Sequence, residues 1–197
     1  MPYSAKIGEK GFTVVELLVT LAIALIVLTA LTSTFLSQRK TFNLQGQITE
    51  MVQTSRNVMD MISREVMLAG YNPTSATIVG IPYASSQLEI RADLSGDGDT
   101  GDTNENIIYT YNDTDLKIIR TEGTGTVTAL PLAENIEAFA FQYYDADGNN
   151  TTTAADIRQI EISVTTRTAA ADPNYSTNSG YRTSTLTSYI TPPNLEL

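Results

Sequence analysis

The sequence of 197 residues contains no cysteine, no histidine and no tryptophan. Without cysteine the chain can form neither a disulfide nor a thiolate nucleophile, and without histidine it lacks the commonest metal ligand and general base. Basic residues are also few, with 12 Lys and Arg against 22 Asp and Glu and a formal net charge of −10. This balance argues against nucleic-acid binding, which depends on basic patches that displace counterions from phosphates.

Proline and charge are both missing from one long N-terminal stretch. There is no proline between Pro2 and Pro73, and no charged residue between Leu17 and Gln38. A bilayer is crossed by about 20 apolar residues, so this stretch is long enough to span one. Glu16 is the one charge at its start. A carboxylate beside a membrane-spanning segment is costly and therefore needs a reason.

Three interpretations of this stretch compete. A secretory signal peptide has a shorter apolar core that ends at a small-residue cleavage site, and no such site follows here. A plain single-span anchor fits the length but does not explain Glu16. The third interpretation places a cleavage site before the apolar run. The segment from Lys10 through Gly11 and Phe12 to Glu16 supports the third, because it resembles the prepilin processing motif of type IV pilins and type II secretion pseudopilins.

The resemblance implies a processing and assembly route. A prepilin peptidase would remove the leader, residues 1–11, by cutting between Gly11 and Phe12, and would methylate the new amine of Phe12. Glu16 would pair with an N-terminal amine during assembly, which is reasonable because a carboxylate and an ammonium attract strongly in a low dielectric. The implied partners are the peptidase, other major and minor pilins, and the inner-membrane assembly platform.

The same resemblance sets the expected location of the chain. It implies an inner-membrane protein with a single span and a periplasmic head, which later enters a pilus or pseudopilus. Charge does not decide the orientation, because Lys6 and Lys10 precede the span while Arg39 and Lys40 follow it.

Beyond the span the apolar residues fall at intervals of three and four, which predicts one helical stripe. They are Leu44, Ile48, Met51, Val52, Val58, Met59, Ile62 and Val66. We expect one helix over about residues 12–69, with a membrane or filament-core part at 12–38 and an amphipathic part at 39–70. Gly70, followed by Pro73, is a typical helix stop. A coiled-coil stalk is an alternative for the second part.

Residues 71–197 are predicted to form a β-rich head. Short runs with strand-like alternation are separated by turn residues. They are residues 77–81, 87–92, 106–111, 116–121, 127–130, 136–144, 157–168 and 184–191. The expected fold class is α+β, with the long N-terminal helix packed on an antiparallel sheet. The resemblance makes this a pilin-like fold.

Three stretches resemble PilW-type minor pilins in particular. They are residues 61–71 at the end of the expected helix, residues 135–145, and the C-terminal strand at 186–194. The J-type minor pseudopilin of type II secretion shares this layout. The resemblance therefore implies a structural minor subunit and leaves the choice between the two machines open.

One acidic, glycine-rich loop is a candidate calcium site. Asp93, Asp97, Asp99, Asp102 and Glu105 alternate there with glycine and small polar residues. This is how a loop presents oxygen ligands to a hard cation. A shorter loop at residues 145–149 is similar. The composition of both loops is also typical of ordinary solvated turns, which are rich in Asp, Asn and Gly. Calcium is thus possible, and no cofactor is required.

No catalytic constellation is visible in the sequence. Ser and Thr are abundant but have no His or Cys partner, and paired carboxylates occur only in the turn-like loops. The prediction is therefore a non-enzymatic subunit. A membrane-anchored calcium-binding or adhesive module that never polymerises is an alternative from a different class.

Overall fold

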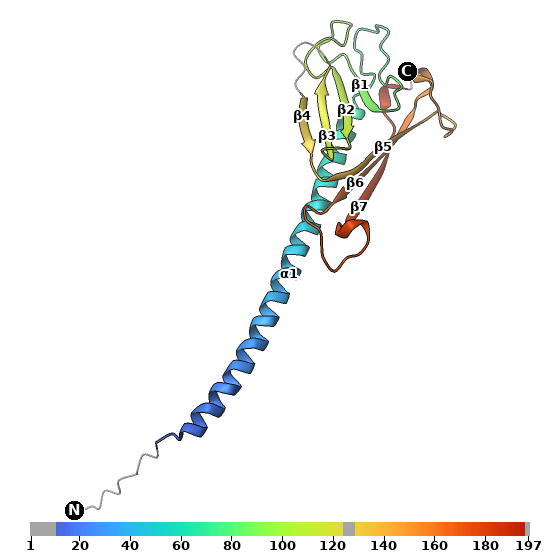
Figure 1. The fold of residues 1–197 in the computed structure, drawn as a ribbon. Helices are drawn as coiled ribbons and strands as arrows, with labels where there is room; N and C mark the ends of the chain where they lie inside the picture. Colours follow the sequence, from blue (N-terminus) through green and yellow to red (C-terminus); the bar gives the residue numbers. More distant parts are fainter. Residues whose placement is uncertain (1–10, 124–128, 196–197) are drawn as a thin grey trace, which may run out of the picture. The chain divides into compact units, whose positions relative to one another are not determined.

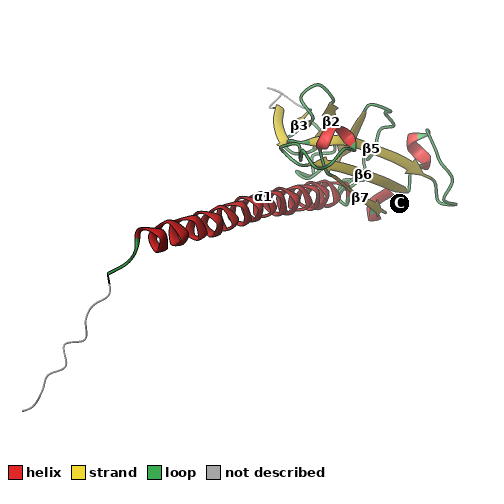
Figure 2. Cartoon of the chain, turned by 60° about the horizontal axis from the view of Figure 1, so that its bottom comes forward, coloured by secondary structure: helices red, strands yellow, loops and turns green. Residues whose placement is uncertain are grey.

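The computed structural model describes residues 11–123 and 129–195, and it divides into two compact units, Met1–Gln45 and Gly46–Leu197. One helix, α1 (Val14–Val66, 53 residues), contributes to both units (Figure 1). The strands β1 to β7 all lie in the second unit. Figure 2 shows α1 in red and the strands in yellow. The predicted α+β class, a long N-terminal helix with antiparallel strands after it, is confirmed.

In the first unit α1 is exposed around its whole circumference. Every residue from 11 to 43 is exposed, including large apolar side chains such as Ile26, Leu31 and Phe42. A helix that is apolar on all sides is stable only inside a membrane or against other apolar surfaces. The helix is long and apolar enough to cross a membrane, as its sequence predicts.

In the second unit α1 buries one stripe. The buried residues are Met51, Ser55, Val58, Met59, Ile62 and Val66. Their spacing follows the helical period, so one face packs against the strands while the opposite face stays polar. α1 ends at Val66, three residues before the predicted end at residue 69. The next residues form turns up to Gly70, whose φ of +77° is the left-handed conformation typical of a helix C-terminus.

The strands form two antiparallel sheets instead of one. The first sheet has the order β1 (Gln87–Arg91), β2 (Asn106–Asn112), β3 (Lys117–Glu122) and β4 (Ala129–Ala133). The second has the order β5 (Ile136–Tyr144), β6 (Gln159–Arg167) and β7 (Thr183–Ile190). Three short 3₁₀ turns complete the unit: Ala154–Asp156, Asn178–Gly180 and Pro193–Leu195.

The break between the sheets falls at Asn135, whose φ is +58°. Residues with positive φ cannot continue a strand, so the chain turns there from β4 into β5. The sheets remain linked because the Ile136 amide donates to the Leu116 carbonyl at 2.9 Å, and the Tyr111 hydroxyl donates to the Ile136 carbonyl at 3.0 Å.

Most predicted strands are present, and the differences are local. Residues 77–81 form no strand, because only Gly80 in this segment bonds to β1, through its carbonyl and the Arg91 amide. The prediction for 127–130 falls partly on residues outside the described part of the chain, and β4 extends to Ala133. Leu116 belongs to a turn with φ +55°, so β3 begins one residue later than predicted.

The hydrophobic core of the second unit joins the helix to both sheets. Ile62 and Val66 of α1, Ile118 of β3 and Ile160 and Ile162 of β6 are all fully buried in one cluster. Alternate residues of β6 contribute to it, as expected for a strand with one covered face. The head is therefore held by apolar packing, as the lack of cysteine requires.

Candidate functional site

The start of α1 is built as a capping box. The Glu16 amide donates to Thr13 Oγ1 at 3.2 Å, while Glu16 Oε2 accepts from the Thr13 amide at 3.3 Å and from its hydroxyl at 3.4 Å. Thr13 precedes the first helical residue, Val14, and Glu16 is the third, which is the spacing of the S/T-x-x-E motif. The first helical backbone bond, from the Leu17 amide to the Thr13 carbonyl, is 3.1 Å long. We did not predict the role of Thr13, although the T-x-x-E pattern signals it.

The capping hydrogen bonds orient the Glu16 side chain through only one of its two carboxylate oxygens. Both bonds from Thr13 go to Oε2, and no described donor lies within hydrogen-bond distance of Oε1. Gly11 and Phe12 lie directly before the cap and are exposed, and a side chain added at Gly11 would meet nothing within 4 Å. The structure therefore brings the predicted residues Gly11, Phe12 and Glu16 together at one accessible helix end.

Threonine hydroxyls inside the apolar part of α1 are satisfied within the helix. The hydroxyls of Thr29, Thr32 and Thr34 donate to the carbonyls four residues earlier at 2.8–2.9 Å. A hydroxyl bonded in this way does not leave an unpaired polar group in a membrane. The threonine cluster does not interrupt α1, which is continuous through it.

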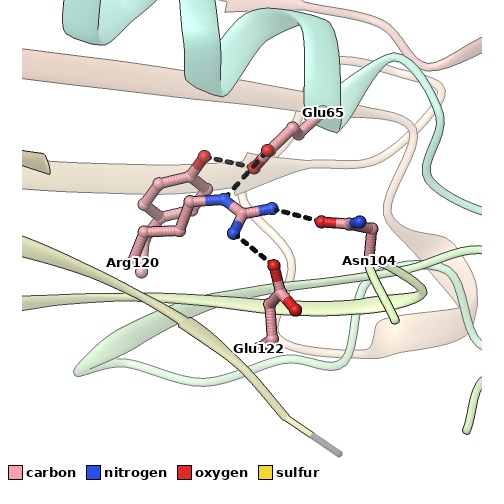
Figure 3. Close-up of polar contacts among 5 residues, drawn as sticks. Glu65, Asn104, Arg120 and Glu122 are labelled. Atoms are coloured by element: carbon pink, nitrogen blue, oxygen red, sulfur yellow. Dashed lines mark hydrogen bonds and ion pairs between the residues drawn. The ribbon is translucent and has the colours of Figure 1, made fainter. Parts of the chain in front are cut away.

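A second polar arrangement, absent from our sequence predictions, fixes the end of α1 to the first sheet (Figure 3). Arg120 on β3 donates from Nε to Glu65 Oε1 at 3.0 Å, and its other nitrogens donate to Glu122 Oε1 at 3.0 Å and Asn104 Oδ1 at 3.1 Å. The Tyr109 hydroxyl donates to the other oxygen of Glu65. Neither Arg120 nor Glu65 has more than 15% of its side chain exposed.

This cluster joins helix and sheet through charge-assisted hydrogen bonds. Burial raises the pKa of Tyr109, and the hydrogen bond to Glu65 raises it further, so the phenol remains a donor. Arg120 lies between two carboxylates, which raise the pKa of its guanidinium although burial acts in the opposite direction. The cluster is structural and has the satisfied hydrogen bonds that a buried ion pair requires.

In the acidic loop the chain folds around two enclosed carboxylates. Asp93 is fully buried and accepts from the Gly96 amide at 2.6 Å, the Gly98 amide at 3.0 Å and the Thr74 hydroxyl at 3.2 Å. Burial alone would raise the pKa of Asp93, but these backbone hydrogen bonds lower it below its usual value. Gly96 and Gly98 both have positive φ, which allows their amides to turn inward.

Glu105 closes the same loop from the start of β2. It is 1% exposed, and its Oε1 accepts from the Leu94 and Ser95 amides at 2.8 and 2.7 Å while Oε2 accepts from the Asp102 amide at 3.1 Å. Burial would raise the pKa of Glu105, and the hydrogen bonds outweigh it and lower that pKa. The Glu105 carboxylate therefore stabilises the loop by accepting hydrogen bonds from three of its backbone amides.

The loop brings together three of the five predicted calcium ligands. Oxygens of Asp93, Asp97 and Glu105 lie within 4.8 Å of one another, and Asp99 and Asp102 are not in this group. A set of carboxylates fits a hard cation, although calcium takes six to eight oxygens. Each of the two buried carboxylates already accepts three hydrogen bonds, so a calcium ion would compete with backbone amides for their lone pairs.

The shorter acidic loop is a turn. Asp145 Oδ1 accepts from the amides of Asp147 and Asn149 at 2.9 and 2.8 Å, and Asn150 forms a bridge back to Tyr144. Hydrogen bonds lower the pKa of Asp145, and the largest effect comes from the Asn149 amide. These contacts explain the Asp and Asn residues as parts of a tight reversal at the end of β5.

Comparison with known proteins adds one specific match. The prokaryotic N-terminal methylation motif matches residues 7–32, which include Gly11, Phe12 and Glu16. A search among curated proteins finds no match. Among solved structures, a type IV-like pilin from Thermus thermophilus is similar over 77% of this chain and 98% of its own, with 14% sequence identity and a TM-score of 0.45. The methylation motif, placed at a capped and exposed apolar helix, supports a type IV pilin-like structural subunit.

Proposed function

We propose that this chain is a minor pilin that serves type IV pilus assembly, at initiation or at the tip. In this proposal the peptidase cuts between Gly11 and Phe12 and methylates the Phe12 amine. The mature helix then leaves the inner membrane and enters a filament of major and minor pilins, with the head on the periplasmic side.

The observation that supports the proposal best is the geometry of Glu16. The capping box with Thr13 holds the carboxylate at the first turn of α1 through Oε2, and Oε1 has no hydrogen-bond donor among the described residues. In the proposed filament, the N-terminal ammonium of a neighbouring subunit would supply the positive charge that pairs with the Glu16 carboxylate. Such a pair is favourable in an apolar bundle when both ions also keep hydrogen bonds, and Thr13 provides them for Glu16.

The processing step is tested by mass spectrometry of the protein from cells with an active prepilin peptidase. We expect a chain that begins at Phe12 and carries one methyl group on its amine. Gly11→Val is the variant that should block cleavage, and we expect the described fold to tolerate it because a Cβ added at Gly11 would meet nothing within 4 Å. If the wild-type chain keeps Met1 in such cells, the proposal is wrong.

The alternative within the same class is a minor pseudopilin of type II secretion. Residues 61–71 and 135–145 resemble PilW-type minor pilins, but the J-type minor pseudopilin shares this layout, so the resemblance leaves the choice between the two machines open. Deletion of the gene separates the two: loss of surface pili supports the proposal, and loss of protein secretion with intact pili supports the pseudopilin.

We also propose, as a separate property of the head, that the Asp93 loop binds calcium. The convergence of Asp93, Asp97 and Glu105 favours it. Asp97 is exposed and Asp93 and Glu105 support the loop backbone, so Asp97→Asn is the variant that removes a ligand with least damage. We expect Ca²⁺ to raise the melting temperature of the full chain in detergent, with a smaller rise for Asp97→Asn. An equal rise in both, or none, excludes the site.

A further inference from the structure

The second sheet covers the core with one face and leaves its other face exposed. Along β6 the residues of the exposed face alternate with buried residues of the core. Near its middle the exposed face has only small side chains. Hydroxyl pairs lie there between Ser163 and Thr187 at 2.9 Å and between Thr165 and Thr185 at 2.8 Å. Larger side chains with other chemistry gather at one end of the same face.

At that end two tyrosines lie beside one carboxylate. The Tyr144 hydroxyl donates to Glu161 Oε2 at 2.6 Å, and Glu161 lies directly opposite Tyr189 in the β6–β7 register. The ring centroids of Tyr144 and Tyr189 are 6.3 Å apart, with an angle of 46° between the ring planes. Tyr189 is 60% exposed, so its ring is accessible from solvent. We call these three residues the Tyr–Glu–Tyr cluster.

The carboxylate of this cluster has no cationic partner in the described part of the chain. No described Lys or Arg forms an ion pair with Glu161, whereas the other carboxylate of β5 and β6, Glu137, pairs with Arg167 at 3.6 Å. The hydrogen bond to Glu161 raises the pKa of Tyr144 to about 12, and the negative charge of Glu161 raises the pKa of Tyr189. Both phenols therefore stay neutral, and nothing in the cluster balances the charge of the carboxylate.

A groove beside the cluster has room for a ligand. Its volume is about 320 Å³, within the range of small-molecule sites. Its lining combines apolar and polar side chains from β5 and β6, among them Ala140, Phe141, Gln142, Tyr144, Glu161 and Ser163. Such a lining suits a ligand that has an apolar body and one polar end.

We propose that this groove binds the ammonium end of a lysine side chain presented by a partner protein. The ammonium pairs with Glu161 beside the tyrosine rings, whose faces attract cations. The four-carbon stem lies along Ala140 and Phe141, because lysine keeps its methylenes on apolar surface while its charge reaches a polar site. Gln142 lies opposite Glu161 and two residues beyond Ala140, about 7 Å along the strand. This distance is comparable with the length of a lysine stem.

Charge favours an ammonium over an anionic or a neutral ligand. The chain has a net charge of −10, which attracts cations and repels phosphates and carboxylates. Arg158, just before β6, donates to the carbonyls of Ala155 and Ile157 at 2.8 and 2.9 Å and does not line the groove. A neutral sugar would leave the charge of Glu161 unbalanced. Because the site lies outside α1, its occupation does not depend on the assembly route proposed above.

Nuclear magnetic resonance of the full chain in detergent, with carbon-13 in the tyrosine rings, tests the site. The probe is lysine with an acetylated α-amine and a methylamidated carboxyl group, so that the side-chain ammonium is its only charge. We expect saturable shifts of the Tyr144 and Tyr189 signals, which Tyr→Phe variants assign. The signal of Tyr109, which is fully buried, should stay in place. The matching norleucine derivative, which lacks the ammonium, should shift none of these signals.

Glu161→Gln should weaken binding of the lysine probe several-fold, because the amide oxygen can still accept from Tyr144 while the negative charge is lost. An unchanged Tyr109 signal in this variant shows that the fold is intact. Asp147→Asn is the matched control, since Asp147 is exposed, does not line the groove and loses the same charge. We expect normal binding in that control.

Three outcomes would overturn the proposal. An equal loss of affinity in Glu161→Gln and Asp147→Asn would indicate general attraction to an acidic surface. Shifts of the Tyr144 and Tyr189 signals with glucose, but not with the lysine probe, would indicate a sugar site. The absence of any shift with the lysine probe would show that the groove does not bind an ammonium group.

Discussion

Arg120 of β3 and Glu65 of α1 lie 55 positions apart in the sequence and form an ion pair at 3.0 Å between Nε and Oε1 (Figure 3). The side chains are 11% and 15% exposed, so the pair is largely shielded from water. It ties the last turns of the helix to the first sheet at the place where the helix ends.

Arg120→Met should destabilise the head by about 3 kcal/mol, because it leaves the Glu65 carboxylate partly buried without its cation. Urea unfolding of the full chain in detergent, followed by circular dichroism, measures the loss. Arg64→Ala is the matched control, since Arg64 pairs with Asp60 at 2.6 Å with both side chains more than 60% exposed. That change should cost less than about 0.5 kcal/mol. Equal effects would show that the Glu65 pair has no special role.

The head should lose stability in acid through Asp93 and Glu105. Hydrogen bonds lower the pKa of both carboxyls in the folded state, so their contribution to stability is fully present above the unfolded pKa values, about 3.9 for Asp and 4.3 for Glu. It is lost as pH falls through the lower, folded pKa values. Melting temperatures between pH 6 and pH 2 measure this. Asp93→Asn should flatten the profile, and an unchanged profile in that variant would contradict the assignment.

Gly80→Ala should be strongly destabilising. A Cβ at Gly80 would lie 2.3 Å from the Gly70 amide nitrogen and 2.6 Å from the Gly70 Cα, so backbone must move. Overpacking of this kind costs about 1–3 kcal/mol. The contrast is Gly46→Ala in α1, where nothing lies within 4 Å. That change should stabilise the helix by up to about 1 kcal/mol. Thermal melting of both variants measures the difference, and a similar shift in both would contradict the close approach at Gly80.

Variants of Glu16 and Thr13 separate the cap from the assembly charge. Glu16→Gln can keep the capping hydrogen bonds but removes the negative charge, so filament incorporation should fail while the helix start stays ordered. Thr13→Ala removes the cap, worth about 1 kcal/mol, and keeps the charge. Incorporation should then fall only in part. The fraction of each variant in sheared filaments measures this. Normal incorporation of Glu16→Gln would show that its charge is not needed.

The long helix and its two faces could be predicted from the sequence because they depend on neighbours along the chain. Apolar residues at intervals of three and four, the absence of proline and the stop at Gly70 are all local signals. The strands of the second sheet were predicted within two residues for the same reason, since alternation along β6 is visible in Ile160, Ile162 and Val164. The prediction of a strand at residues 77–81 was wrong, because a β-like composition does not supply a partner strand. This segment has only one backbone hydrogen bond to β1.

The sequence by itself determined the motif at the start of the helix: the Gly11–Phe12 junction, Glu16 and the apolar run are contiguous, so this pattern does not depend on the rest of the fold. Only the tertiary structure decided how distant residues meet. It paired Arg120 with Glu65 and enclosed Asp93 and Glu105 with backbone amides. These contacts depend on strand order and loop closure, which the alternation of side chains along a strand does not encode.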